Sequence, residues 1–177
     1  MSDAARELLR GVAVALRELS VDGVTEALSH RFVDVVEQAT VRPVVPTHVS
    51  VVDQMTTNGP PLRDDLLALT STLPWAPSPR VDDGGTGVAL LDFGECLDLG
   101  TLTVGAMAVG PDNAYPEHDH PPLEMYLVLG GTAWWRHGGA DDYVERRAGD
   151  LVINHPNDRH GVRTGEDALL AVYVLDT

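Results

Sequence analysis

The stretch Tyr115-Pro-Glu-His-Asp-His-Pro-Pro-Leu-Glu-Met-Tyr126 places four chemically active side chains at positions of the same parity: His118, His120, Glu124 and Tyr126. Side chains alternate between the two faces of a β-strand, so these four would share one face of a strand. The odd-numbered residues further along are apolar and would face the other way: Leu123, Met125, Leu127 and Leu129. The pattern predicts a strand with an apolar face for a core and a polar face that binds a metal.

The residue types at this stretch restrict the metal. Imidazole and carboxylate together favour Fe, Mn, Ni, Cu or Zn over Ca and Mg, which prefer shells of oxygen ligands. Cys96 is the only cysteine, so a thiolate cluster and an internal disulfide are both excluded. A fourth ligand must come from another strand, and both His155 and His160 are available. The three remaining histidines are interpreted as ordinary surface or core residues: His30, His48 and His137.

The net charge of the chain restricts the classes of partner that it is expected to bind. The 177 residues carry a formal net charge of −15, and all 12 basic residues are arginines. An acidic surface repels phosphate backbones, so nucleic-acid binding is disfavoured, and a cationic or zwitterionic small substrate is mildly favoured. The start of the chain lacks a signal-peptide core, and the longest apolar run, Ala168 to Leu175, is too short to span a membrane. We therefore expect a cytoplasmic protein without a membrane partner.

Hydrophobic periodicity divides the chain into a helical third and a β-rich remainder. Helices are predicted over residues 3–19, 24–39 and 61–69, with an extended, proline-containing connector over residues 41–47. Short apolar runs bounded by glycine-rich turns then predict strands at 101–109, 123–129, 132–136, 143–146, 151–154 and 168–175. The expected architecture is mainly β, with a helical region, residues 1–72, packed on an antiparallel β-barrel formed by residues 73–177.

The order of these motifs resembles the cupin superfamily. A first motif runs from His118 to Gly131, and a second runs from Gly149 through a short apolar strand and Pro156 to His160. The resemblance implies a double-stranded β-helix, or jelly-roll barrel, with a metal bound in its mouth. It also makes His160 a better candidate than His155 for the fourth ligand.

A closer resemblance covers most of the chain. The opening stretch, then Trp135-Arg136, His155-Pro156 and the segment from Arg163 to Tyr173 are similar to the dimethylsulfoniopropionate (DMSP) lyase family of cupins. The resemblance implies cleavage of this small carboxylate substrate into dimethyl sulfide and acrylate, with one divalent Fe, Mn, Ni or Zn ion. It implies metal ligands at His120, Glu124 and His160, with His118 nearby or ligating. It also implies a catalytic base at Tyr126 and a substrate-binding role for Tyr115. A homodimer is expected from the way such barrels commonly pack.

Two departures and two rival functions accompany this resemblance. Gly161-Val162 follows His160 where the family usually has Ala-Met, and the chain ends Val174-Leu175-Asp176-Thr177 where members often place a tryptophan. The same ligands also suit another metal cupin enzyme, such as an Fe(II) dioxygenase or a small-acid isomerase, because a fold does not fix a function. A non-catalytic cupin that binds a small molecule is the second rival.

Tyr126 has a physical case as the base that does not depend on the family. It lies two residues beyond Glu124 on the predicted ligand face. A free tyrosine has a pKa of roughly 10, and a neighbouring metal cation would lower it.

Overall fold

A computed structural model describes residues 2–55, 59–138 and 142–177. The predicted helices are confirmed as α1 (Ser2–Leu19), α2 (Gly23–Gln38) and α3 (Pro61–Leu69). Short 3-10 turns add η1 (Ser50–Gln54), η2 (Thr70–Thr72) and η3 (Phe93–Glu95). Within the described residues, none of the helices has the length and apolar character needed to cross a membrane.

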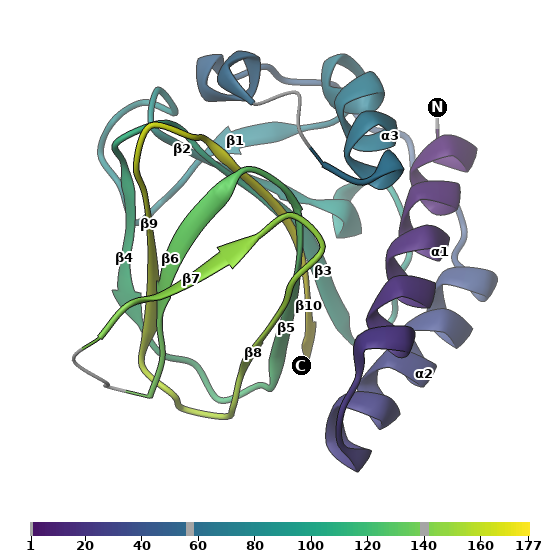
Figure 1. The fold of residues 1–177 in the computed structure, drawn as a ribbon. Coiled ribbons are helices and arrows are strands. Elements are labelled where there is room, and N and C mark those ends of the chain that lie inside the picture. Colours follow the sequence, from purple (N-terminus) through teal and green to yellow (C-terminus); the bar gives the residue numbers. More distant parts are fainter. Residues whose placement is uncertain (1, 56–58, 139–141) are drawn as a thin grey trace.

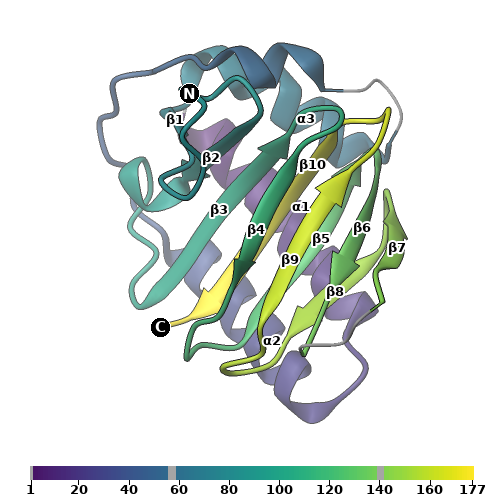
Figure 2. The same ribbon diagram turned by 90° about the vertical axis from the view of Figure 1, so that its left-hand side faces the viewer.

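Two antiparallel sheets face each other and form the barrel (Figures 1 and 2). The larger sheet has the order β1-β2-β3-β10-β5-β8, and the smaller has the order β4-β9-β6-β7. The strands of the larger sheet are β1 (Trp75–Pro77), β2 (Val88–Asp92), β3 (Leu102–Val109), β5 (Glu124–Gly130), β8 (Leu151–Asn154) and β10 (Leu169–Asp176). Those of the smaller sheet are β4 (Ala114–His118), β6 (Thr132–Arg136), β7 (Val144–Arg147) and β9 (His160–Thr164).

The larger sheet buries both of its faces. In β5, Met125 and Leu127 pack in the core beneath the helices, while Tyr126 and Val128 pack inside the barrel. This alternation follows the period of two expected of a strand. It also explains why β10 is one continuous apolar run, because a strand buried on both faces needs apolar residues at every position.

The helices cover the outer face of the larger sheet, as Figure 1 shows. Alpha-helix α1 buries one stripe at helical spacing, which includes Leu8, Val12 and Leu16. Asp22 caps α2 by accepting hydrogen bonds from the N–H groups of Val24 and Thr25. The mainly β barrel with a helical N-terminal region is therefore confirmed, and the boundary at residues 72/73 stays a prediction.

The prediction that Tyr115–Tyr126 forms one strand is wrong. The segment is strand, loop and strand, because β4 ends at His118 and β5 begins at Glu124, in the opposite sheet. Pro121 and Pro122 lie in the connecting loop, where their missing N–H groups break no sheet hydrogen bond. Four short strands were also not predicted from the sequence: β1, β2, β4 and β9.

Gly131 sits where the chain passes from β5 in one sheet to β6 in the other. Its φ is +81°, and a Cβ there would lie 1.8 Å from the carbonyl oxygen of Ala168. Gly100 also has a positive φ, +60°, but no atom lies within 4 Å of the corresponding Cβ position. A side chain at Gly100 would therefore meet backbone strain alone, whereas a side chain at Gly131 would meet both strain and a steric clash.

We predict that Gly131→Ala lowers the free energy of unfolding by about 3 kcal/mol, and Gly100→Ala by about 1 kcal/mol. Denaturant unfolding of both variants beside the wild type would measure the difference. Equal losses in the two variants would contradict the steric argument.

Candidate metal centre

A β-bulge in β4 aims two site residues into the barrel. Strand β4 pairs with β9 at Tyr115↔Val162 and at His118↔His160, and the register shifts between these pairs. Tyr115 and His118 are three residues apart and would face opposite ways in a regular strand. The bulge re-aims one of them, so that the two rings contact edge to face with centroids 5.0 Å apart.

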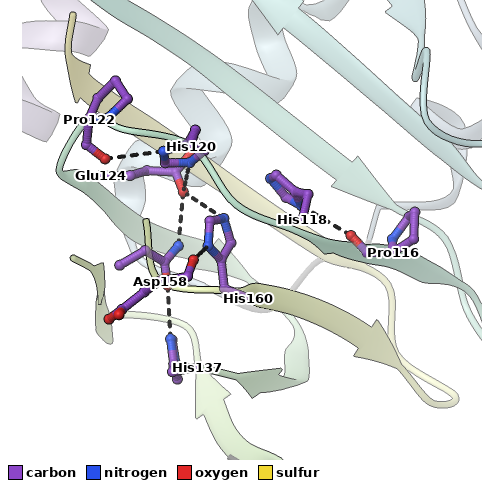
Figure 3. Close-up of polar contacts among 9 residues, drawn as sticks. Pro116, His118, His120, Pro122, Glu124, His137, Asp158 and His160 are labelled. Atoms are coloured by element: carbon purple, nitrogen blue, oxygen red, sulfur yellow. Dashed lines mark hydrogen bonds and ion pairs between the residues drawn. The ribbon is translucent and has the colours of Figure 1, made fainter. Parts of the chain in front are cut away.

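The loop after β4 positions His120, and the first residue of β5 is Glu124. The carbonyl of His120 accepts a hydrogen bond of 2.8 Å from the N–H of Asn157, which ties this loop to the one before β9. Glu124 is only 3% exposed and points into the barrel beside the histidines (Figure 3).

His160, the first residue of β9, completes the group. It is 2% exposed, and its ring lies 4.3 Å from that of His118 and 4.9 Å from that of His120, between centroids. His155, the alternative from the sequence, is exposed. The candidate ligand nitrogens of the three histidines lie within 4.8 Å of one another.

Each of the three histidines is oriented by a backbone carbonyl, as Figure 3 shows. The Nδ1 atoms lie 3.0 Å, 3.1 Å and 2.7 Å from the oxygens of Pro116, Pro122 and Asp158, respectively. A carbonyl only accepts, so Nδ1 carries the proton in all three rings, and in the neutral ring Nε2 presents a lone pair. This arrangement is typical of imidazoles that bind a metal through Nε2.

The Nε2 atoms of His120 and His160 lie 3.2 Å and 3.3 Å from the same oxygen, Oε2 of Glu124. The contact of His160 lacks hydrogen-bond geometry, and its buried Nε2 has no other partner in the described chain. Lone pairs that face a carboxylate oxygen need a proton or a cation between them. The histidine triad, His118, His120 and His160, could therefore hold a metal ion, and Glu124 adds a carboxylate of the kind that transition metals accept beside imidazole.

The charges around Glu124 agree with this geometry. Burial by itself would raise the pKa of Glu124, but hydrogen bonds from His120 and Asn154 and the contact with His160 hold it well below its usual range. The hydrogen bond to Glu124 raises the pKa of His120 in turn. Burial lowers the pKa of His118, which favours the neutral ring that a metal requires.

A hydrogen-bonded chain behind Glu124 was not predicted from the sequence. Asn154 is fully buried and donates from Nδ2 to Oε2 of Glu124 at 2.8 Å. Its Oδ1 lies 2.8 Å from Nδ1 of His137, which therefore donates to it. His137 was interpreted as an ordinary residue, because nothing in the sequence shows that β6 brings it behind the site.

His118, His120 and Glu124 line a cavity of about 180 Å³ together with three tyrosines. Its lining residues are Arg80, Leu90, Thr103, Tyr115, His118, His120, Glu124, Tyr126, Tyr173 and Leu175. Burial and the nearby charge of Glu124 raise the pKa of Tyr126 well above its usual value. Burial also raises the pKa of Tyr115, although Arg80 opposes that rise. The cavity is small enough to select a small molecule.

Comparisons with known proteins agree with the fold. The family model described as dimethylsulfoniopropionate lyase matches residues 94–171. All of the chain aligns with 93% of the DMSP lyase DddQ from Ruegeria pomeroyi DSS-3, with 21% identity and a TM-score of 0.78. It also aligns over its full length with 94% of a chain from crystal structures of the DMSP lyases RdDddP and RnDddQII, with 22% identity and a TM-score of 0.71. A search of curated proteins found no match.

The double-stranded barrel, with three histidines and a glutamate gathered at its cavity, defines a cupin with a candidate metal centre. The match to the dimethylsulfoniopropionate lyase family model covers much of the barrel and every candidate ligand, so over this part the chain is similar to that family.

We predict that His160→Ala abolishes tight metal binding and that His155→Ala leaves it unchanged. His160 points a buried Nε2 at Glu124, whereas His155 is exposed. Elemental analysis of each variant, after metal loading and gel filtration, would measure the bound metal. Retention of a full equivalent by His160→Ala would remove this residue from the ligand set.

We predict that Asn154→Leu weakens metal affinity by about 10- to 100-fold, because it removes a donor that orients Glu124. Val152→Ala is the matched control, since Val152 lies on the same strand, is buried and packs inside the barrel. Chelator competition would give the affinities, and thermal unfolding of the metal-free proteins would give their stabilities. A similar loss of affinity in both variants would show a general packing effect instead.

Proposed function

We propose that this protein is a metal-dependent lyase that splits DMSP into dimethyl sulfide and acrylate. The observation that carries the proposal is the cluster of His118, His120 and His160 beside the Glu124 carboxylate, at a small cavity that three tyrosines also line. The match to the DMSP lyase family model over residues 94–171 supports the same reaction.

The reaction is a β-elimination. A base removes the proton on the carbon next to the carboxylate, and that electron pair forms the new carbon–carbon double bond. The carbon–sulfur bond breaks, and its electron pair leaves with sulfur as neutral dimethyl sulfide. A divalent metal bound by His118, His120, His160 and Glu124 would supply a Lewis acid that stabilises the charge developing on the substrate carboxylate.

Tyr126 is our candidate for the base. It follows Glu124 by two residues on the inner face of β5, and its ring lines the same cavity as the Glu124 carboxylate. Burial and the negative charge of Glu124 raise the pKa of Tyr126 and keep the phenol protonated. A divalent cation beside Glu124 would offset the carboxylate charge and so favour the phenolate. The proton from the substrate would then go to the Tyr126 oxygen.

The aromatic walls suit a sulfonium cation. Tyr126 and Tyr173 face each other across β5 and β10 with ring centroids 5.5 Å apart, and both line the cavity. The faces of aromatic rings attract cations, so these rings can hold the sulfonium end of the substrate. The last four residues contain no tryptophan of the kind expected from the family resemblance, but Tyr173 supplies an aromatic ring on the same strand. Tyr115, on the opposite sheet, is our candidate for substrate binding.

We predict that Tyr126→Phe keeps the bound metal and lowers kcat by about 100-fold or more, because it removes the proton acceptor. Tyr143→Phe is the control, since the Tyr143 ring stacks on Arg163 and does not line the cavity. Gas chromatography of the headspace over protein loaded with Fe, Mn, Ni or Zn would follow dimethyl sulfide release. Near-full turnover by Tyr126→Phe would exclude it as the base.

The same assay tests the function itself. Absence of dimethyl sulfide with all four metals would contradict the lyase proposal, and oxygen consumption by the iron-loaded protein would favour the dioxygenase. The homodimer and the cytoplasmic location stay predictions.

A further inference from the structure

One permanently charged cation, the guanidinium of Arg80, lines the candidate cavity. Arg80 lies in the loop between β1 and β2 and lines the cavity with Tyr115 and His118. The histidines and tyrosines there can all become neutral, whereas a guanidinium keeps its charge at any pH the protein experiences. In a chain with a net charge of −15, a cation at this position is a specific feature of the site.

The charge of Arg80 is felt by the two β4 residues that face the cavity. Burial raises the pKa of Tyr115 and lowers the pKa of His118, and the positive charge of Arg80 lowers both values. No carboxylate of the described residues lies within ion-pair distance of Arg80, in contrast to Arg136 and Arg159, which both pair with Glu117. A guanidinium offers five N–H donors, so Arg80 can bind an anionic ligand through several of them.

The loop that carries Arg80 is well anchored. Ser78 is 3% exposed, its N–H donates to Val88, and its hydroxyl accepts from the N–H of Arg80 at 3.2 Å. The Asp83 carboxylate accepts from the N–H groups of Gly85, Gly87 and Val88 at 2.8 Å, 2.9 Å and 3.0 Å. Asp83 therefore organises the loop that carries Arg80.

We propose that Arg80 is the residue that recognises the substrate carboxylate at the mouth of the cavity, with Tyr115 beside it. This inference deepens the proposed function and takes its substrate class from it. Guanidinium groups bind carboxylates through paired, charge-assisted hydrogen bonds. Arg80 also repels the sulfonium, so attraction and repulsion both direct that end of the substrate to Tyr126 and Tyr173, which lie on the sheet opposite Tyr115.

Two probes separate the ends of the substrate. The carboxylate 4-methylpentanoate has the shape of DMSP with a neutral carbon in place of sulfur, and ethyldimethylsulfonium keeps the cation without a carboxylate. Titration calorimetry on metal-loaded and metal-free protein would give the affinity of each probe. Arg80→Gln should lower the affinity for 4-methylpentanoate by about 10- to 100-fold. The affinity for ethyldimethylsulfonium should stay the same or increase. Arg80→Lys should recover part of the loss, because a point charge replaces the fork.

Arg17→Gln is the control for the change in net charge, since Arg17 is exposed on α1 and does not line the cavity. Unchanged 4-methylpentanoate affinity in Arg80→Gln, or equal weakening of both probes, would overturn the inference. So would a wild-type protein that does not bind 4-methylpentanoate. If the wild type binds this probe through Arg80 but releases no dimethyl sulfide from DMSP, the inference stands and the lyase proposal fails.

Discussion

The buried carboxylate of Glu124 is the group on which the candidate site depends. One of its oxygens faces His120 from the loop, His160 from β9 and Asn154 from β8, so three separate elements meet at a single atom. A carboxylate that is 3% exposed remains charged only if such partners offset its loss of water. Among these partners, His120 and His160 offer ring nitrogens, and Asn154 holds the accepting carboxylate oxygen in place. A transition metal would complete this arrangement.

This convergence requires a barrel with a rigid wall, and the helical region helps to provide it. The outer face of the larger sheet is as apolar as its inner face, with Met125 and Leu127 pointing toward the helices and Tyr126 toward the cavity. Without α1 and its neighbours, that outer face would be exposed to water. The N-terminal third is therefore part of the structural support of the site.

The helices, six of the strands and the alternation within β5 could be predicted from the sequence, because each follows from local periodicity. Edge strands β1 and β4 could not, because they are short and interrupted by Pro77 and Pro116. The single-strand interpretation of Tyr115–Tyr126 placed His118 and Glu124 on one face. The two side chains do meet, but they come from two different sheets. The bulge in β4 and the loop before β5 bring them together, and the alternation of a single strand does not.

The sequence by itself determined the chemical types at the site, because imidazoles and a carboxylate at this spacing have few uses apart from metal binding. It also determined the fold class, since the order of apolar runs and glycine turns suits an antiparallel barrel. Only the tertiary structure decided which partners complete the site. Arg80, His137 and Asn154 reach it from loops and strands with no local signal, because their roles arise from packing between segments far apart in the chain.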